Sequence, residues 1–200
     1  MSRMLSDIAK NISRFIEKIE RMASYSQIKY CKKAGCRITL GKNVKIENPE
    51  CVVLGDNVHI NDYVWISIPS VEHILEQDIK DISPELIIGD NSYVGRFGTI
   101  ACVTNVCIGR DVLISDRVYI GDSVHNWHIK NIPIKEQGIS SPGPIVIGNG
   151  TWVGINVSIL PNVTIGKNCV IGANSVVTKS IPDFSVYAGI PARSINRNNK

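Results

Sequence analysis

Aliphatic side chains recur at every sixth position over the C-terminal part of the chain. From residue 145 the sequence divides into the hexads IVIGNG, TWVGIN, VSILPN, VTIGKN, CVIGAN and SVVTKS, with Ile or Val in every third place. The first places hold small or β-branched residues, and glycine takes the fourth place at 148, 154, 166 and 172. Shorter runs with the same pattern stand at 38–67 and 86–123. The repeat therefore covers most of the chain.

A period of six does not fit an α-helix, because six steps of about 100° turn the chain by about 600° and successive repeats would face different directions. Short extended segments that each end in a bend at Gly-Asn or Gly-Asp do fit it. Three such segments close a triangular coil of about eighteen residues, so roughly 116 residues in register predict about six coils. The sequence predicts an all-β solenoid, a parallel β-helix.

The first 30 residues depart from the repeat. Their apolar side chains recur in steps of three or four with charges between them, which predicts an amphipathic helix. The apolar positions are Leu5, Ile8, Ile12, Phe15, Ile16, Ile19 and Met22. We expect this helix to cover the open end of the β-helix, where strand edges would otherwise be unpaired. The alternative is a weak contact of residues 1–24 with an anionic membrane surface, which the acidic residues of the segment disfavour.

Two further stretches interrupt the repeat. Residues 68–86 form an excursion for which a short helical turn is expected, and residues 125–144 form a second long loop. A long loop that leaves a rigid solenoid is more often functional than not. The expected organisation is a helical cap over 1–30 and a β-helix domain over 31–200 that carries both loops and ends in a C-terminal tail.

Composition narrows the function classes. The 200 residues suit one domain, and a net charge of +4 does not call for a nucleic-acid partner. The N-terminus lacks the unbroken apolar run of a secretory signal, so we expect a cytosolic protein, with the inner face of the membrane as a further location. The six cysteines are expected to be reduced there, and Cys31 with Cys36 makes only a weak redox or metal pair.

The C-terminal third holds a set of motifs in a specific order. Between residues 133 and 193 stand PI followed by QG, then TWVG, GANSVVTK and GIPAR. In these motifs and in its repeat over 38–193, the chain resembles the left-handed β-helix acyltransferases, the hexapeptide-repeat family that transfers acetyl groups from acetyl-CoA. The resemblance implies a left-handed coil and acetyl-CoA as acyl donor without a metal. It also implies a homotrimer whose active sites lie between subunits.

The reaction requires the acceptor to lose a proton near neutral pH, a task that suits imidazole. Of the four histidines, only His125 stands where this family has its catalytic histidine, in the segment DSVHNWHIKNIPI. The segment departs from the family pattern, with Ser123 in place of a histidine and Ile129 in place of an acid. We expect His125 to be the general base. The group that orients it is left open between Asp122, a backbone carbonyl and an acid from a neighbouring subunit.

Other residues are candidates for binding the acceptor. Trp127 offers a flat face to a sugar ring, and His128 and Asp122 are expected contacts. His59 is expected on the surface, and His73 in the first excursion could reach a neighbouring cleft. Galactoside and maltose acetyltransferases carry Asn and Asp where this chain has Phe97 and Cys102, which disfavours a small free sugar.

The resemblance also assigns the coenzyme A site. Trp152 and Gly154 would flank the thioester, Ala173 would line the pantetheine arm, and Thr178, Lys179 and Arg193 would hold the nucleotide phosphates. Lys179 and Arg193 carry more weight than Gly154 and Ala173, because the latter also suit the bends of the coil.

The predicted function is O-acetylation of a sugar unit of a bacterial surface polysaccharide, either lipopolysaccharide or capsule. The first alternative is N-acetylation of an amino sugar nucleotide. A γ-class carbonic anhydrase is the second, with His125, His128 and either His59 or His73 around zinc. The third is an inert scaffold that keeps the rod for assembly alone.

Overall fold

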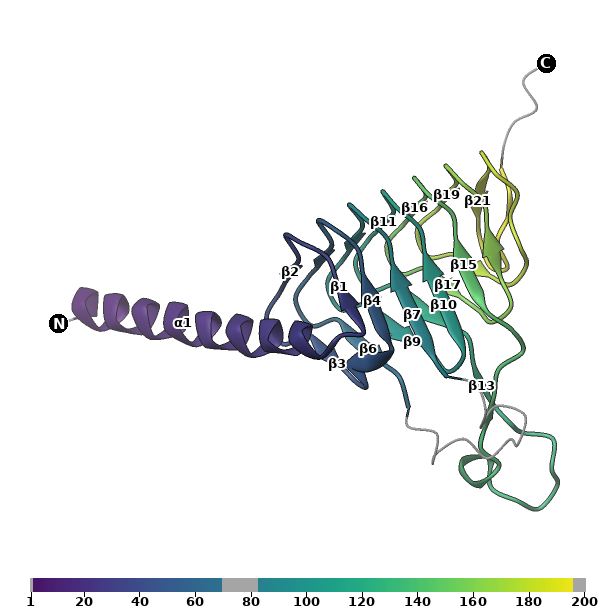
Figure 1. The fold of residues 1–200 in the computed structure, drawn as a ribbon, viewed down its shortest axis with the longest axis horizontal. Helices are drawn as coiled ribbons and strands as arrows, with labels where there is room; N and C mark the ends of the chain where they lie inside the picture. The colour runs from purple at the N-terminus through teal and green to yellow at the C-terminus, as the bar shows by residue number, and fades with distance from the viewer. Residues whose placement is uncertain (1, 70–82, 196–200) are drawn as a thin grey trace.

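The strands of the chain wind into a three-sided coil. The computed structural model describes residues 2–69 and 83–195. Consecutive strands of the coil lie in different sheets, so each sheet gains one strand per turn, as Figure 1 shows. Neighbouring turns pair in parallel, for instance Val106 with Ile145 and Ile120 with Ile159. The predicted parallel sheets and N-terminal helix are confirmed, and sheets A and C each contain six strands, in agreement with about six coils.

The sheets are built from very short strands. Sheet A contains β1 (Lys33–Ala34), β4 (Val52–Leu54), β7 (Glu85–Ile88), β10 (Asn105–Ile108), β15 (Ile145–Ile147) and β18 (Thr164–Ile165). Sheet B contains β2 (Thr39–Leu40), β5 (His59–Ile60), β8 (Tyr93–Val94), β11 (Leu113–Ile114), β16 (Trp152–Val153), β19 (Val170–Ile171), β21 (Val186–Ala188) and β22 (Arg193–Ser194). Sheet C contains β3 (Lys45–Ile46), β6 (Trp65–Ser67), β9 (Thr99–Ala101), β12 (Tyr119–Gly121), β17 (Ser158–Ile159) and β20 (Val176–Val177).

The hexad explains the core. Both the third-place side chains, such as Ile147 and Ile159, and the first-place side chains, such as Val157 and Thr151, are buried inside the coil. The second-place residues between them point outward, because side chains alternate along an extended segment. The interior is therefore filled by aliphatic side chains along the whole coil.

Residues in the left-handed region turn the corners. Asn43, Asn57, Asn91 and Asn156 have φ between 54° and 58°, a conformation that Asn tolerates better than most residues. Their amides also join the turns, since Asn57 Nδ2 donates to Asn91 Oδ1 at 2.9 Å. The Gly-Asn and Gly-Asp bends of the hexads thus become corners of the prism.

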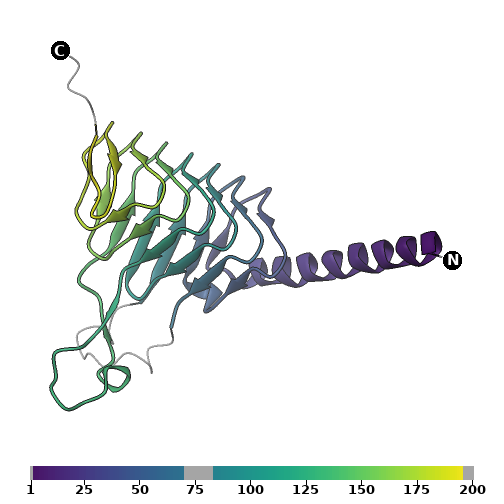
Figure 2. The same cartoon turned by 180° about the vertical axis from the view of Figure 1, so that it is seen from behind.

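Helix α1 (Ser2–Tyr25) meets the coil through its C-terminal half. The buried Ser24 hydroxyl accepts a hydrogen bond from Val44 N at 3.1 Å, and Gln27 in η1 (Ser26–Tyr30) bonds Val44 O and Ile46 N. The rest of the helix projects beyond the first turn, as Figures 1 and 2 show. The contacts that cover this end of the coil therefore come from the junction around Ser24 and Gln27.

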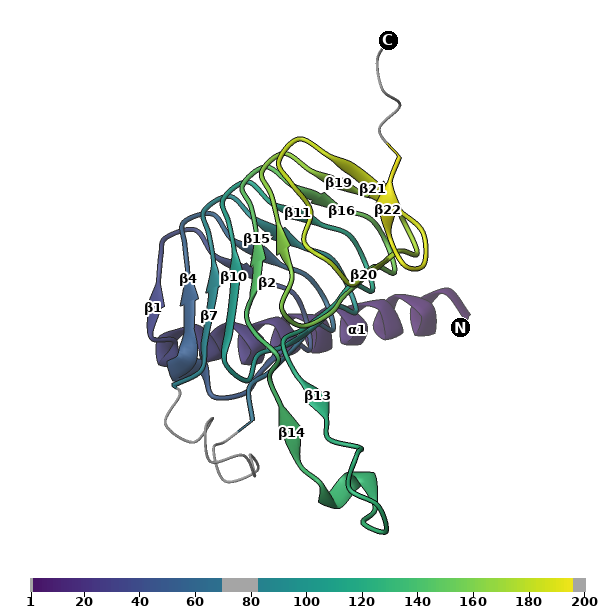
Figure 3. The same ribbon diagram turned by 90° about the vertical axis from the view of Figure 1, so that its right-hand side faces the viewer.

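The second predicted excursion is present as a long loop that stands out from the coil in Figure 3. It contains the antiparallel pair β13 (Val124–His125) and β14 (Ile139–Ser140) and the short helix η4 (Ile134–Glu136). Most of the first excursion, including its expected helical turn, lies outside the described residues. Helix η2 (Pro49–Cys51) precedes β4, and the antiparallel pair β21–β22 lies at the C-terminal end of the coil.

Candidate active site

His125 lies at the edge of a groove on the outer face of sheet C. The groove has a volume of about 440 Å³ and lies between this sheet and the β13–β14 hairpin. Trp65, Thr99 and Tyr119 form its floor, because they occupy matching outward positions on three successive turns. Ile139, the pairing partner of His125, lies on the hairpin side. We call this space the histidine groove.

The described lining of the histidine groove contains no carboxylate, amine or guanidinium group. Apart from the imidazole, its polar groups are the hydroxyls of Ser67, Thr99, Tyr119 and Ser123. Burial raises the pKa of the Tyr119 phenol, and the Asp122 carboxylate nearby raises it further, so the phenol is neutral at physiological pH. Such a surface can exchange hydrogen bonds with hydroxyl groups and pack against apolar faces.

Asp122 anchors the start of the hairpin. Its carboxylate is completely buried and accepts hydrogen bonds from the backbone amides of Val103, Thr104 and Asn105 and from the Thr104 hydroxyl, at 2.8–2.9 Å. The Ser141 hydroxyl donates to the Asp122 carbonyl at 2.7 Å. Asp122 thus ties both ends of the loop to the coil. The predicted contact with the acceptor would require this turn to open.

A second set of hydrogen bonds shapes the far end of the loop. The buried Gln137 accepts from Ile129 N at 3.0 Å and donates to the carbonyls of Ile129 and Ile132 at 3.0 and 2.8 Å. Asn126 Nδ2 donates to the Gln137 carbonyl at 3.1 Å. Because Asn126 follows His125 directly, these bonds hold the backbone at the histidine. We did not predict this role from the sequence, although the QG pair was a visible signal.

The imidazole itself is exposed. Among the described residues of this chain, none forms a hydrogen bond with the His125 ring, and the Asp122 carboxylate accepts from Val103, Thr104 and Asn105 instead.

Trp127 and His128 lie on the outer part of the loop. Trp127 is 72% exposed, and its ring meets the His128 ring edge-on, with centroids 6.0 Å apart. Neither residue lines the histidine groove within one chain.

The residues predicted for coenzyme A fall into two groups. Gly154 and Ala173 lie on adjacent turns at the corner between sheets B and C, where a Cβ on Gly154 would come within 2.8 Å of Ala173 N. Trp152 is on the same turn as Gly154, half exposed, and its indole N–H donates to the Ser115 hydroxyl at 3.1 Å. Gly154 is buried against the next turn, whereas Ala173 is exposed. We call the surface at these two residues the Gly154–Ala173 strip.

Arg193 belongs near this strip, since its neighbour Ala192 donates to Val176 O at 2.8 Å. Thr178 and Lys179 lie elsewhere: they follow β20 and mark the corner between sheets C and A. All three side chains are exposed. The Lys179 and Arg193 cations are therefore at the surface, and Arg193 Nη1 donates to the Ala192 carbonyl at 3.0 Å.

His125 and the Gly154–Ala173 strip are at opposite edges of sheet C in one chain. The hairpin leaves between β12 of sheet C and β15 of sheet A, whereas the strip connects sheet B to sheet C. The structure thus brings Gly154, Ala173 and Arg193 together, but it does not bring them to His125.

The remaining residues singled out from the sequence do not line the histidine groove in the described part of the chain. His59 is exposed on β5, and His73 lies outside the described residues. Phe97 stacks on Tyr63 with ring centroids 5.2 Å apart. Cys102 is fully buried, which raises the pKa of its thiol to about 12. Neither Phe97 nor Cys102 replaces the polar contacts that Asn and Asp would make.

Metal-ligand side chains do not gather in the described part of the chain, where no three His, Cys, Asp or Glu residues form a group that could hold an ion. The six cysteines are unpaired, Cys31 and Cys36 included. Over residues 2–69 and 83–195, no helix is long and apolar enough to cross a bilayer.

Comparison with known proteins identifies the repeat. Residues 144–179 match the family model for the bacterial transferase hexapeptide, six repeats. The chain is 38% identical over 120 residues to Escherichia coli WbbJ, which is named as a lipopolysaccharide biosynthesis O-acetyl transferase; the match covers 57% of this chain and 61% of WbbJ. It is 35% identical over 161 residues to the E. coli galactoside O-acetyltransferase, covering 80% of this chain and 64% of that enzyme. The predicted resemblance to the hexapeptide-repeat acetyltransferases is confirmed.

The fold has solved counterparts as well. The N-acyltransferase AntD of Bacillus cereus, solved with dTDP and 3-hydroxybutyryl-CoA, matches with a TM-score of 0.67 at 22% identity, over 84% of this chain and 83% of AntD. This likeness concerns the fold. The chain spans between about half and just under two thirds of the length of the curated relatives that it matches most strongly.

Proposed function

We propose that this protein is an acetyl-CoA-dependent O-acetyltransferase that modifies a sugar unit of a bacterial surface polysaccharide. The observation that carries the proposal is the position of His125, an exposed imidazole at the edge of a groove lined by aromatic rings and hydroxyls. The similarity to WbbJ and to a galactoside O-acetyltransferase supports the same chemistry. The left-handed sense of the coil is part of this proposal.

His125 would act as general base. It would take the proton from the acceptor hydroxyl as that oxygen attacks the acyl carbon, and it would return the proton to the departing sulfur. Acetyl-CoA supplies the acetyl thioester, so an oxygen–carbon bond replaces the sulfur–carbon bond and the coenzyme leaves as its thiol. No covalent enzyme intermediate is needed, and the buried Cys102 could not serve as a nucleophile.

The coenzyme would lie along the B–C corner of a neighbouring copy. Ala173 is exposed where the pantetheine arm would pass, while Arg193 of that corner and Lys179 are exposed cations suited to phosphate. Three copies around a threefold axis would form three equivalent clefts, each with His125 from one copy and the Gly154–Ala173 strip from the next. The acid that orients His125 would then also come from that neighbour.

The acceptor is expected to be neutral where it contacts the histidine groove. The described lining has hydroxyls but no carboxylate or cation beside the imidazole. A sugar hydroxyl on a glycan fits this surface, and Trp65 and Tyr119 offer faces for the ring. Trp127 and His128 would contact parts of the acceptor outside the groove.

A thiol-release assay tests the proposal. Purified full-length protein with acetyl-CoA should release coenzyme A thiol when given a neutral lipopolysaccharide or capsular glycan, and mild alkali should remove the new acetyl group, because esters hydrolyse and amides persist. An alkali-stable product with amino sugar nucleotides would favour the N-acetyl alternative. If no acceptor leads to release of coenzyme A thiol, the result would favour the inert scaffold.

A further inference from the structure

Helix α1 carries an apolar seam that the described part of the chain leaves uncovered. Its members lie in alternating steps of three and four and are between 44% and 64% exposed. They are Leu5, Ile8, Ile12, Phe15, Ile19 and Met22. This spacing is the a and d pattern of a coiled coil over three heptads, and it contains no charged residue.

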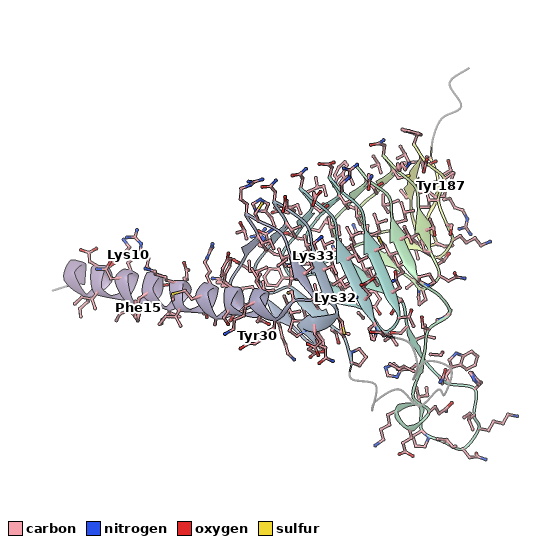
Figure 4. All side chains as sticks on the ribbon, in the orientation of Figure 1. Lys10, Phe15, Tyr30, Lys32, Lys33 and Tyr187 are labelled. Carbon is pink, nitrogen blue, oxygen red and sulfur yellow. The ribbon has the colours of Figure 1, made fainter. Side chains whose placement is uncertain are left out.

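The coil is attached to the opposite side of the helix. Lys42 Nζ lies 3.7 Å from the Glu17 carboxylate, and Asn43 Nδ2 donates to the Glu20 carboxylate at 3.4 Å. In the heptad numbering of the seam, Glu17 and Ser24 are f positions and Glu20 is a b position, so they lie across the helix from a and d. Figure 4 shows the f-position Lys10 and the d-position Phe15 on opposite sides of α1. The first turns of the same copy border the seam at Ile12 and Met22, but these side chains remain 55% and 64% exposed, so the body leaves most of the seam uncovered.

The charges around the seam argue for a protein partner instead of a bilayer. A helix that lies on an anionic membrane collects Lys and Arg on its polar face. Here Asp7, Glu17 and Glu20 are interspersed among the basic residues, and two of these acids are already used by Lys42 and Asn43. A strict heptad seam without charge is complementary to another copy of itself.

We propose that residues 5–22 pack against the same segment of two other copies as a parallel three-helix coiled coil. The threefold relation rests on the proposed function, and helices that run along a threefold axis all point in the same direction. Ile8, Ile12 and Ile19 at a and d positions favour more than two strands. Ile16 and Ala9 at e positions widen the apolar face so that each helix contacts two neighbours. The helix is thus an assembly element that extends beyond the coils.

Cysteine trapping in the full chain tests this contact. Ile8→Cys places a thiol at a d position, where two of three parallel helices can join through a disulfide. Ser6→Cys, two residues away at a b position, is the matched control and keeps the same six native cysteines. Under mild oxidation, Ile8→Cys should run mainly as a reducible covalent dimer, and Ser6→Cys as a monomer. Equal behaviour of the two variants overturns the proposal.

Two further measurements separate the possible failures. The native mass of the unchanged protein shows whether it forms a trimer. If it is a trimer but Ile8→Cys forms no disulfide, the helix contact is wrong and the shared active site can still be right. If it is a monomer that still releases coenzyme A thiol, the active site is not shared between copies.

Flotation with vesicles of anionic phospholipid tests the membrane alternative by comparing Phe15→Glu with Ser13→Glu. Vesicle binding that only Phe15→Glu removes, without trapping of Ile8→Cys, would assign the seam to a membrane and overturn the proposal.

Discussion

The coil and the histidine loop hold their shapes by different interactions. In the coil, every turn buries aliphatic side chains such as Ile147 and Ile159 against the turns on both sides. In the loop over 122–141, the large side chains are mostly exposed, and the backbone is held by the hydrogen bonds of Asp122, Asn126 and Gln137. The difference indicates that substitutions in the coil should change stability first, whereas substitutions in the loop should change activity first.

The largest effect is expected from Gly148→Ala in the coil. A Cβ at this position would lie 2.5 Å from the carbonyl carbon of Gly166, so the backbones of two turns would have to separate. We expect a loss of about 3 kcal/mol or more in the free energy of unfolding, measured by chemical denaturation.

Gly98→Ala is the matched control, because its Cβ would meet its nearest neighbour at 3.4 Å, an ordinary contact. If the two variants unfold at the same denaturant concentration, packing between turns does not determine the stability of the coil.

The next effect is expected at the loop. His125→Ala should lower the rate of acetyl transfer by about a hundredfold or more, because a positioned base contributes about 10² to 10⁴ in rate. Its melting temperature should stay within the error of the unchanged protein, since the side chain is exposed. His59→Ala, another exposed histidine, serves as control and should keep full activity. Near-normal turnover of His125→Ala would refute its role as base.

Gln137→Ala should have a smaller effect of the same kind. It removes three hydrogen bonds that position the loop around His125, so we expect kcat to fall about tenfold while the KM for acetyl-CoA is unchanged. The neighbouring exposed Glu136→Gln should leave both values as they are. A rise of KM with constant kcat would show that Gln137 serves coenzyme binding instead of loop geometry.

The smallest effect is expected from Lys179→Ala at the edge of the coil. Loss of one exposed cation should raise the KM for acetyl-CoA by about three- to tenfold and leave kcat and stability nearly unchanged. Lys167→Ala removes an exposed lysine at a different corner and should change nothing. An unchanged KM in both variants would count against contact between Lys179 and a phosphate.

The sequence allowed the coil to be predicted because its information is local and repeated. The first and third positions of each hexad are predicted to be buried, and residues such as Val157 and Ile165 do lie inside the coil. The amphipathic character of residues 1–30 was equally readable. The direction in which this helix leaves the coil could not be predicted, because it depends on the hydrogen bonds of Ser24 and Gln27 with Val44 and Ile46.

The loop was less predictable, because its contacts join residues that no period relates. Asp122 was expected beside the acceptor or the imidazole, and its carboxylate instead holds Val103, Thr104 and Asn105. Trp65 and Tyr119 were not singled out, although both take the outward second place of their hexads. Their approach to His125 follows from the stacking of turns, which the sequence of one turn does not show.

The central claim is that His125 of one copy works with the coenzyme strip of another. Two inactive variants test it most directly: His125→Ala, and Ala173→Trp, which fills the exposed strip without entering the core. When the two are unfolded together in equal amounts and refolded, random assembly places an intact His125 against an intact strip at about a quarter of the clefts, and activity should return to about that fraction of the unchanged protein. If the mixture stays as inactive as its two components, although both variants form mixed trimers, the site is not shared between copies.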